Sequence, residues 1–334
     1  MAENLKLKPL LSSIGQPVFA VLDGAQFDDL PNALFEGDFV YRSLYLDRGN
    51  GTADQLKTAP QLVWLDRDTR LYRRDDDYDD FSPDSALLDR LLTLIDERPA
   101  VVFWVCDAGG KALYRHLRGI NKVLLPSSAN MDRGKSYERD PLARAPNQPN
   151  QVGYDMVLFR HCDANVMAQV LPSLTYVNMS RVLGPASQIL YSADADWGDK
   201  PLRLNRGEDM PLSPPGPLKL SINEMQAIEK RRQSAARLRR HIYLKQTCPE
   251  ETAGATNEAI EEHLRVCEET GKKLGLVSEG AQFRWAFMMC KTNGRIAQSP
   301  EALEFITKRG SSPDEQVKLF MRGITGALVA GDRA

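Results

Sequence analysis

The residues of this chain with the strongest catalytic and metal-binding chemistry are its four histidines and five cysteines. His161 and Cys162 are adjacent, so in a strand their side chains point to opposite faces and form no nucleophile–base pair without a local distortion. We see no carboxylate or thiol at ligand spacing from His241 or His263. The cysteines lack C-x-x-C spacing, which indicates reduced thiols. The sequence therefore predicts no metal site, no cofactor and no catalytic residues.

The segment DAGGK (107–111) is the nearest approach to a phosphate-binding loop. A P-loop requires Gly at position 105 and Ser or Thr at position 112, where this chain has Val105 and Ala112. We expect Asp107 to cap a helix whose start needs flexible glycines. The chain also lacks the G-x-G-x-x-G, G-x-S-x-G and H-E-x-x-H motifs.

Two charged stretches could bind ions or nucleic acid. The acidic run 75–80 lacks the glycine and the terminal glutamate of a calcium loop, so we expect a solvated turn. The basic stretch 229–245 would distribute its arginines and lysines around a helix instead of along one face, and it has a single aromatic residue, Tyr243. We expect this helix to be solvated and to pair with nearby acids such as Glu250, Glu251, Glu261 and Glu262.

Composition and charge narrow the class of protein. The 334 residues are 42% hydrophobic and 26% charged, with a net charge of −2. This composition excludes a chain disordered throughout, a collagen-like repeat and a disulfide-dense mini-protein. No apolar run approaches the roughly 18 residues of a membrane span, and no signal sequence is evident, so we expect a cytoplasmic protein.

The elements that must position these residues divide into two patterns. In the first two hundred residues, short apolar runs typical of strands buried on both faces alternate with helical patterns; the runs are 17–23, 61–65, 100–106 and 155–160. We expect one helix to begin at Ser82 and another near Asp163. These features predict an α/β N-terminal lobe with a mixed β-sheet over residues 1–200.

The second pattern is wholly helical. Residues 201–217 contain five prolines and predict a stiff linker between domains. After it, capping residues and helical periodicity predict an all-α C-terminal lobe over 218–334, with helices beginning at Ser221, Thr256, Ser278, Pro300 and Pro313.

Six short segments occur in order along the first lobe: LDG (22–24), SLY (43–45), AP-x-LVWL (59–65), HLR (116–118), LFRHCD (158–163) and VLGP (182–185). Together they resemble elements of the adaptor (chaperone) proteins that load effectors onto the type VI secretion spike of bacteria. The similarity covers most of residues 17–192, and the helical half is similar mainly in architecture. Where the family shows F-R-x-x-D-P-R, this chain has Ala164 and Asn165 in place of the proline and second arginine.

The resemblance implies a non-enzymatic adaptor with two protein partners, a type VI effector and the VgrG-type spike. It implies no membrane partner, and we expect no nucleic acid. The candidate partner-binding residues are His116, Arg118, Arg160, Asp163, Phe283, Trp285, Phe287 and Met288. For the aromatic and methionine residues of 281–290, the sequence favours a place in the core of the helical bundle over a partner surface.

Two alternatives stay open. One is an α/β enzyme, a hydrolase or a nucleotide-using protein, whose motif is unfamiliar. The other is nucleic-acid binding through 229–245. For two of the arginines we favour a structural role, since Arg118 and Arg160 are expected to reach carboxylates or carbonyls near the end of the sheet, where Asp23 leaves its strand.

Overall fold

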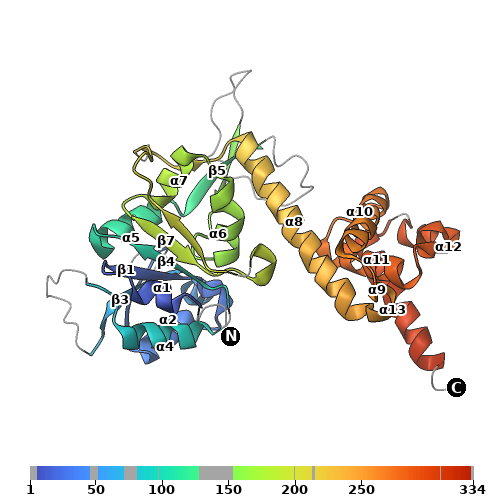
Figure 1. The fold of residues 1–334 in the computed structure, drawn as a ribbon, viewed down its shortest axis with the longest axis horizontal. Coiled ribbons are helices and arrows are strands. Elements are labelled where there is room, and N and C mark those ends of the chain that lie inside the picture. The colour runs from blue at the N-terminus through green and yellow to red at the C-terminus, as the bar shows by residue number, and fades with distance from the viewer. Residues whose placement is uncertain are drawn as a thin grey trace. The chain divides into compact units, whose positions relative to one another are not determined.

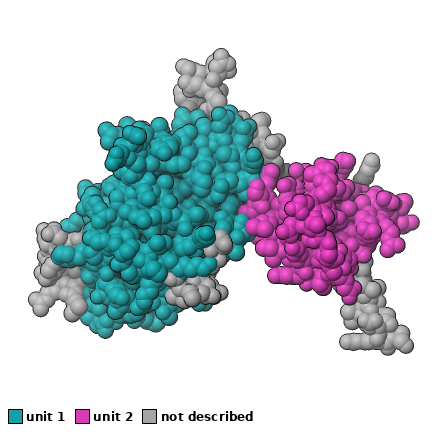
Figure 2. Space-filling view, viewed as in Figure 1, with its two compact units in different colours: residues 1–231 teal, residues 232–334 magenta. Residues whose placement is uncertain are grey.

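The computed structural model describes residues 6–45, 52–70, 81–96, 98–127, 153–198, 200–212, 215–308 and 310–331. The chain divides into two compact units, residues 1–231 and residues 232–334 (Figure 2). The acidic run 75–80 lies outside the described residues. None of the helices in these ranges is long and apolar enough to cross a membrane.

The first unit is built on a six-stranded sheet in the order β2-β3-β1-β4-β7-β8. Every neighbouring pair in it is antiparallel. The strands are β1 (Val18–Leu22), β2 (Phe39–Ser43), β3 (Gln61–Asp68), β4 (Val101–Val105), β7 (Gln188–Tyr191) and β8 (Leu202–Asn205). A second sheet, β6-β5-β9, joins β5 (Lys122–Pro126) to β6 (Tyr154–Leu158) and, in parallel, to β9 (Leu218–Lys219).

Helices cover both faces of the larger sheet (Figure 1). One face buries α1 (Lys8–Ser12), α2 (Leu30–Glu36) and α4 (Ser85–Ile95). The other buries α5 (Gly109–Gly119), α6 (Ala164–Val170) and α7 (Tyr176–Leu183). The described residues of this unit also form α3 (Ala53–Thr58), the short 3-10 helices η2 (Gly24–Gln26), η5 (Leu171–Ser173) and η6 (Ala195–Trp197), and the start of α8 (Ile222–Thr247). Because both faces are covered, β1 and β4 are buried along their whole length, as their apolar runs predict.

The second unit is helical, as predicted. It contains the end of α8 (Ile222–Thr247), then α9 (Pro249–Thr252), α10 (Asn257–Lys273), α11 (Glu279–Lys291), η7 (Arg295–Gln298), α12 (Pro300–Ile306) and α13 (Pro313–Gly331). The predicted caps Thr256 and Ser278 accept hydrogen bonds from the first turns of α10 and α11. The α/β lobe followed by a helical lobe is therefore confirmed.

The Pro-rich segment 201–217, predicted as a linker, contributes a strand to the first unit. Within it, β8 pairs with β7, and β9 follows directly and pairs with β5. Glu224 at the start of α8 accepts hydrogen bonds from the backbone and hydroxyl of Thr175 at 2.8 and 2.9 Å. These contacts place the division between the units inside α8, after Arg231.

Three local expectations are wrong. Asp84, not Ser82, caps α4. Asp107 does not cap α5, since its carboxylate accepts from Gln16 Nε2 at 2.8 Å and the helix has Ala108 at its N-cap. The expected need for glycine at that helix start is confirmed, because Gly109 has φ +81°. The run 155–160 is not buried on both faces, because Met156 and Leu158 on one face of β6 are exposed.

Candidate functional site

Arg160 follows β6 and joins two of the six segments. Its Nη2 donates to Asp23 Oδ2, at the end of β1, and lies 3.4 Å from Asp163 Oδ2. Asp163 also caps α6 by accepting from the backbone N–H of Asn165 and Val166 at 2.9 and 3.1 Å. The expected contact of Arg160 with a carboxylate where Asp23 leaves its strand is thus present.

Exposure distinguishes the members of this ion cluster. The side chain of Arg160 is 40% exposed, whereas those of Asp23 and Asp163 are 3% and 11% exposed. Burial disfavours the charge of Arg160, but the Asp23 carboxylate raises its pKa. Burial raises the pKa of Asp163. No described residue accepts a hydrogen bond from Nε or Nη1 of Arg160, so these two donors can serve an outside acceptor.

The thiol and the imidazole next to Arg160 are buried. Burial raises the pKa of Cys162 well above its usual value, and it lowers the pKa of His161 to about 3. His161 Nε2 lies 2.8 Å from Asn121 Oδ1. Burial also raises the pKa of Tyr45, whose hydroxyl has no hydrogen-bond partner in the described part of the chain. A protonated thiol beside a neutral imidazole is not an activated nucleophile at neutral pH.

His116 connects the HLR and VLGP segments. Its Nε2 lies 2.7 Å from the Val182 carbonyl oxygen, and its ring packs against Gly184, which has φ +56°. Burial lowers the pKa of His116 to about 4. The indole of Trp104 in β4 meets the rings of His116 and His161 edge-on, with centroids 6.4 and 6.3 Å apart. Trp104 therefore joins the two histidines of the six segments.

The other segments contact one another through the backbone. Leu44 N donates to Pro60 O at 3.0 Å, which joins SLY to AP-x-LVWL. Gly24 packs so closely on the same segment that a Cβ there would lie 2.5 Å from Ala59 O. All six segments thus belong to one set of contacts, which we call the six-segment network.

Arg118 contacts an aromatic side chain, whereas Arg160 contacts carboxylates. Its guanidinium lies over the ring of Tyr114, 5.6 Å from the centroid, and Nη1 is 3.4 Å from Tyr114 Oη. Tyr114 Oη in turn donates to Ser43 O at 3.1 Å, in the SLY segment. The carboxylate or carbonyl partner expected for Arg118 stays a prediction.

The aromatic and methionine candidates of the second unit differ in how deeply they are buried. Trp285 is fully buried and donates from Nε1 to Thr270 Oγ1 at 2.9 Å, and Met288 is also buried. Their place in the bundle core is confirmed. Phe283 and Phe287 are half-buried against Tyr243, with ring centroids 5.2 and 6.5 Å apart. Of the four candidates, only these two have partly exposed side chains.

The basic helix pairs with acidic side chains, as expected. Arg237 and Arg240 both bind Glu268 of α10, and Arg239 Nε lies 2.8 Å from Glu279 of α11. Of the predicted acids, Glu261 lies 3.1 Å from His241 Nδ1. One i, i+4 pair on α10 was not predicted: Cys267 Sγ lies 3.5 Å from His263 Nε2. Within the described residues, no group of three or more His, Cys, Asp or Glu could hold a metal ion.

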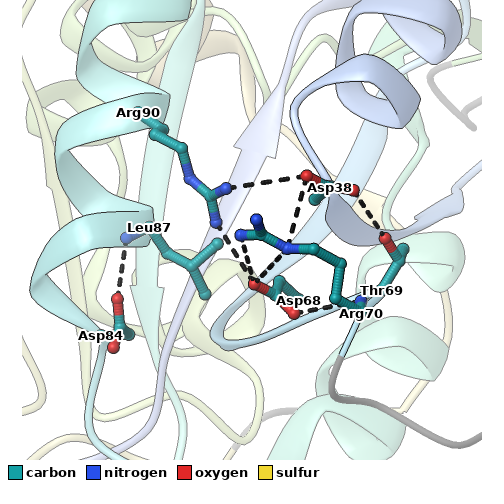
Figure 3. Close-up of polar contacts among 7 residues, drawn as sticks. All are labelled: Asp38, Asp68, Thr69, Arg70, Asp84, Leu87 and Arg90. Carbon is teal, nitrogen blue, oxygen red and sulfur yellow. Dashed lines mark hydrogen bonds and ion pairs between the residues drawn. The ribbon is translucent and has the colours of Figure 1, made fainter.

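A second charged cluster lies between the end of β3 and α4 (Figure 3). Asp68 lies 2.9 Å from Arg70 and 3.7 Å from Arg90, and Asp38 lies 3.5 and 4.0 Å from the same two arginines. The negative charges of the two aspartates thus balance the positive charges of the two arginines. We assign this cluster a structural role, joining the turn before β2 to β3 and α4.

No protein-family model, curated protein or solved structure shows significant similarity to this chain.

Replacing Arg160 by Ala is expected to lower the free energy of unfolding by about 1–3 kcal/mol, because Asp23 would lose its charged donor while staying buried. The partial exposure of Arg160 keeps the expected loss below that of a fully buried pair. Urea unfolding of Arg160→Ala, Asp23→Asn and the double variant measures it. Additive losses in this cycle would show that the two side chains are not coupled.

Proposed function

We propose that this chain is a non-enzymatic adaptor that binds a type VI secretion effector in the bacterial cytoplasm and loads it onto the VgrG-type spike. The observation that carries the proposal is the six-segment network. Segments separated by more than a hundred residues, such as LDG and LFRHCD, meet through Asp23 and Arg160. Residues that resemble a family pattern and also contact one another are better explained as one inherited structural unit than as chance matches.

The chemistry of the network also supports binding over turnover. The thiol of Cys162 and the imidazole of His161 are buried and uncharged, whereas Arg160 has two donors available to an outside acceptor. An adaptor must hold a cargo segment and present it to a second protein, which requires surfaces and hydrogen-bond donors instead of an activated nucleophile.

The test is deletion of the gene for this chain in its source bacterium. We expect delivery of the effector encoded beside it to be lost, because the effector would not reach the spike. Secretion of the spike itself should continue, and delivery should return when the wild-type gene is supplied on a plasmid. A strain lacking the spike serves as the control for delivery by this route. Unchanged delivery of that effector in the deletion strain would refute the proposal.

A further inference from the structure

The outer edge of β6 has backbone groups that no described strand uses. Phe159 N donates to Asn121 O at 2.8 Å and Ser127 N donates to Gly153 O at 2.7 Å. In the antiparallel register these bonds make 153, 155, 157 and 159 the hydrogen-bonded positions toward β5. The N–H and C=O groups of Tyr154, Met156 and Leu158 therefore point away from β5, and within the described residues β6 pairs only with β5.

The solvent face of this small sheet is apolar. Val123, Val157 and Leu218 face the core, so the alternate residues face outward. Among those, Met156 is 41% and Leu158 is 56% exposed.

Two exposed lysines border the apolar side chains on the same face. Lys122 pairs in register with Leu158, and Lys219 Nζ lies over the Tyr154 ring, 4.0 Å from its centroid. The face thus combines apolar contact area with positive charge at its border.

The outer strands of the larger sheet differ from β6. In β2 the register shifts between Phe39 and Val40, and Arg42 is exposed. In β8 the exposed residues are Arg203 and Asn205. Bulges and charged side chains are the usual means by which proteins protect an edge strand from pairing. The exposed side chains of β6 are apolar, so this edge lacks that protection.

We propose that the β6 edge binds an extended segment of the effector, which adds as a strand beside Tyr154–Leu158. The proposal rests on the adaptor function. The segment would pair its backbone with the outward groups of β6, place apolar side chains on Met156 and Leu158, and carry Asp or Glu toward Lys122 and Lys219. Backbone pairing would supply affinity, and the apolar and acidic side chains would supply specificity.

The test uses the full-length tagged chain co-expressed with the full-length effector encoded beside it. Met156→Pro removes an N–H that points outward, so β6 keeps its bonds to β5 while an added strand loses a donor. We expect the dissociation constant of the complex between this variant and the effector to rise about tenfold or more. Arg203→Pro is the matched control, because its N–H also points away from the neighbouring strand. The second variant is the double substitution Met156→Lys/Leu158→Lys. Its control is Leu212→Lys, because Leu212 is also an exposed apolar residue, with 93% of its surface exposed.

The outcomes separate the two proposals. If the wild-type chain retains no effector, the adaptor function fails, and the edge proposal with it. If the wild type and both β6 variants retain the effector equally well while remaining folded, the edge proposal fails and the adaptor function stands. If the chain alone is a dimer in sedimentation and Met156→Pro makes it a monomer, a second copy occupies the edge, which also overturns the proposal. Weakened binding in both β6 variants and in neither control is the supporting result.

Discussion

Replacing Gly184 by Ala is expected to lower the free energy of unfolding of the first unit by about 2–5 kcal/mol. Gly184 ends α7 with φ +56° and ψ −120°, a conformation that strains any residue with a Cβ. A Cβ at this position would also lie 2.2 Å from the His116 ring, and that ring is fixed by its contacts with Val182 and Trp104. Urea unfolding followed by circular dichroism measures the loss.

The two causes of this loss can be separated. Gly184→Ala/His116→Ala removes the ring and with it the steric clash, so the double variant should lose less than the sum of the two single variants. Gly15→Ala is the control, since nothing lies within 4 Å of a Cβ there and its φ is not positive. A Gly184→Ala variant as stable as wild type would show that the packing of His116 on Gly184 is not tight in solution.

The sequence predicted most accurately the elements whose signals are local. The caps Asp163, Thr256 and Ser278 and the opening prolines Pro300 and Pro313 stand where expected, because a cap acts on backbone groups within three residues. The central strands β1 and β4 were also identified, since their apolar runs are buried by helices on both faces.

Elements that depend on distant pairing were missed. β8 and β9 have four and two residues and lie in or beside a Pro-rich stretch, and each exists because a strand from elsewhere in the chain pairs with it. The antiparallel order of the larger sheet could not be read from the runs either, because burial on both faces makes antiparallel strands as apolar as parallel ones.

The candidate site was predicted in part. The contact of Arg160 with Asp23 followed from the positions of both residues at strand ends. Trp104 and Gly184 were missed as positioning residues, although a glycine before Pro185 is a frequent helix end and offered a signal. The exposure of β6 had no signal in the composition of 155–160, since an edge strand and a central strand of this length can both be apolar.

Lowering the pH from 7 to 5 is expected to destabilise the first unit by about 1–2 kcal/mol for each of His116 and His161. Burial lowers their pKa values to about 4 and about 3, below the value of about 6.5 for an unfolded imidazole. Between pH 7 and pH 5 the unfolded chain therefore binds protons that the folded unit does not bind. The stabilising contribution is complete above about pH 6.5 and is lost as the pH falls toward the folded values.

Urea unfolding at pH 7 and pH 5 measures this difference, and NMR titration of the histidine ring protons assigns it. His116→Gln/His161→Gln should be less stable than wild type at pH 7 but should lose much less stability between pH 7 and pH 5.

Asp163 contributes with the opposite sign, because burial raises its pKa and the folded unit binds that proton more tightly than the unfolded chain does. Asp163→Asn keeps a capping side chain. Because it removes this opposing contribution, the variant should lose more stability than wild type between pH 7 and pH 5. A wild-type chain equally stable at both pH values would show that the two imidazoles, and Trp104 between them, are reached by water in the folded protein.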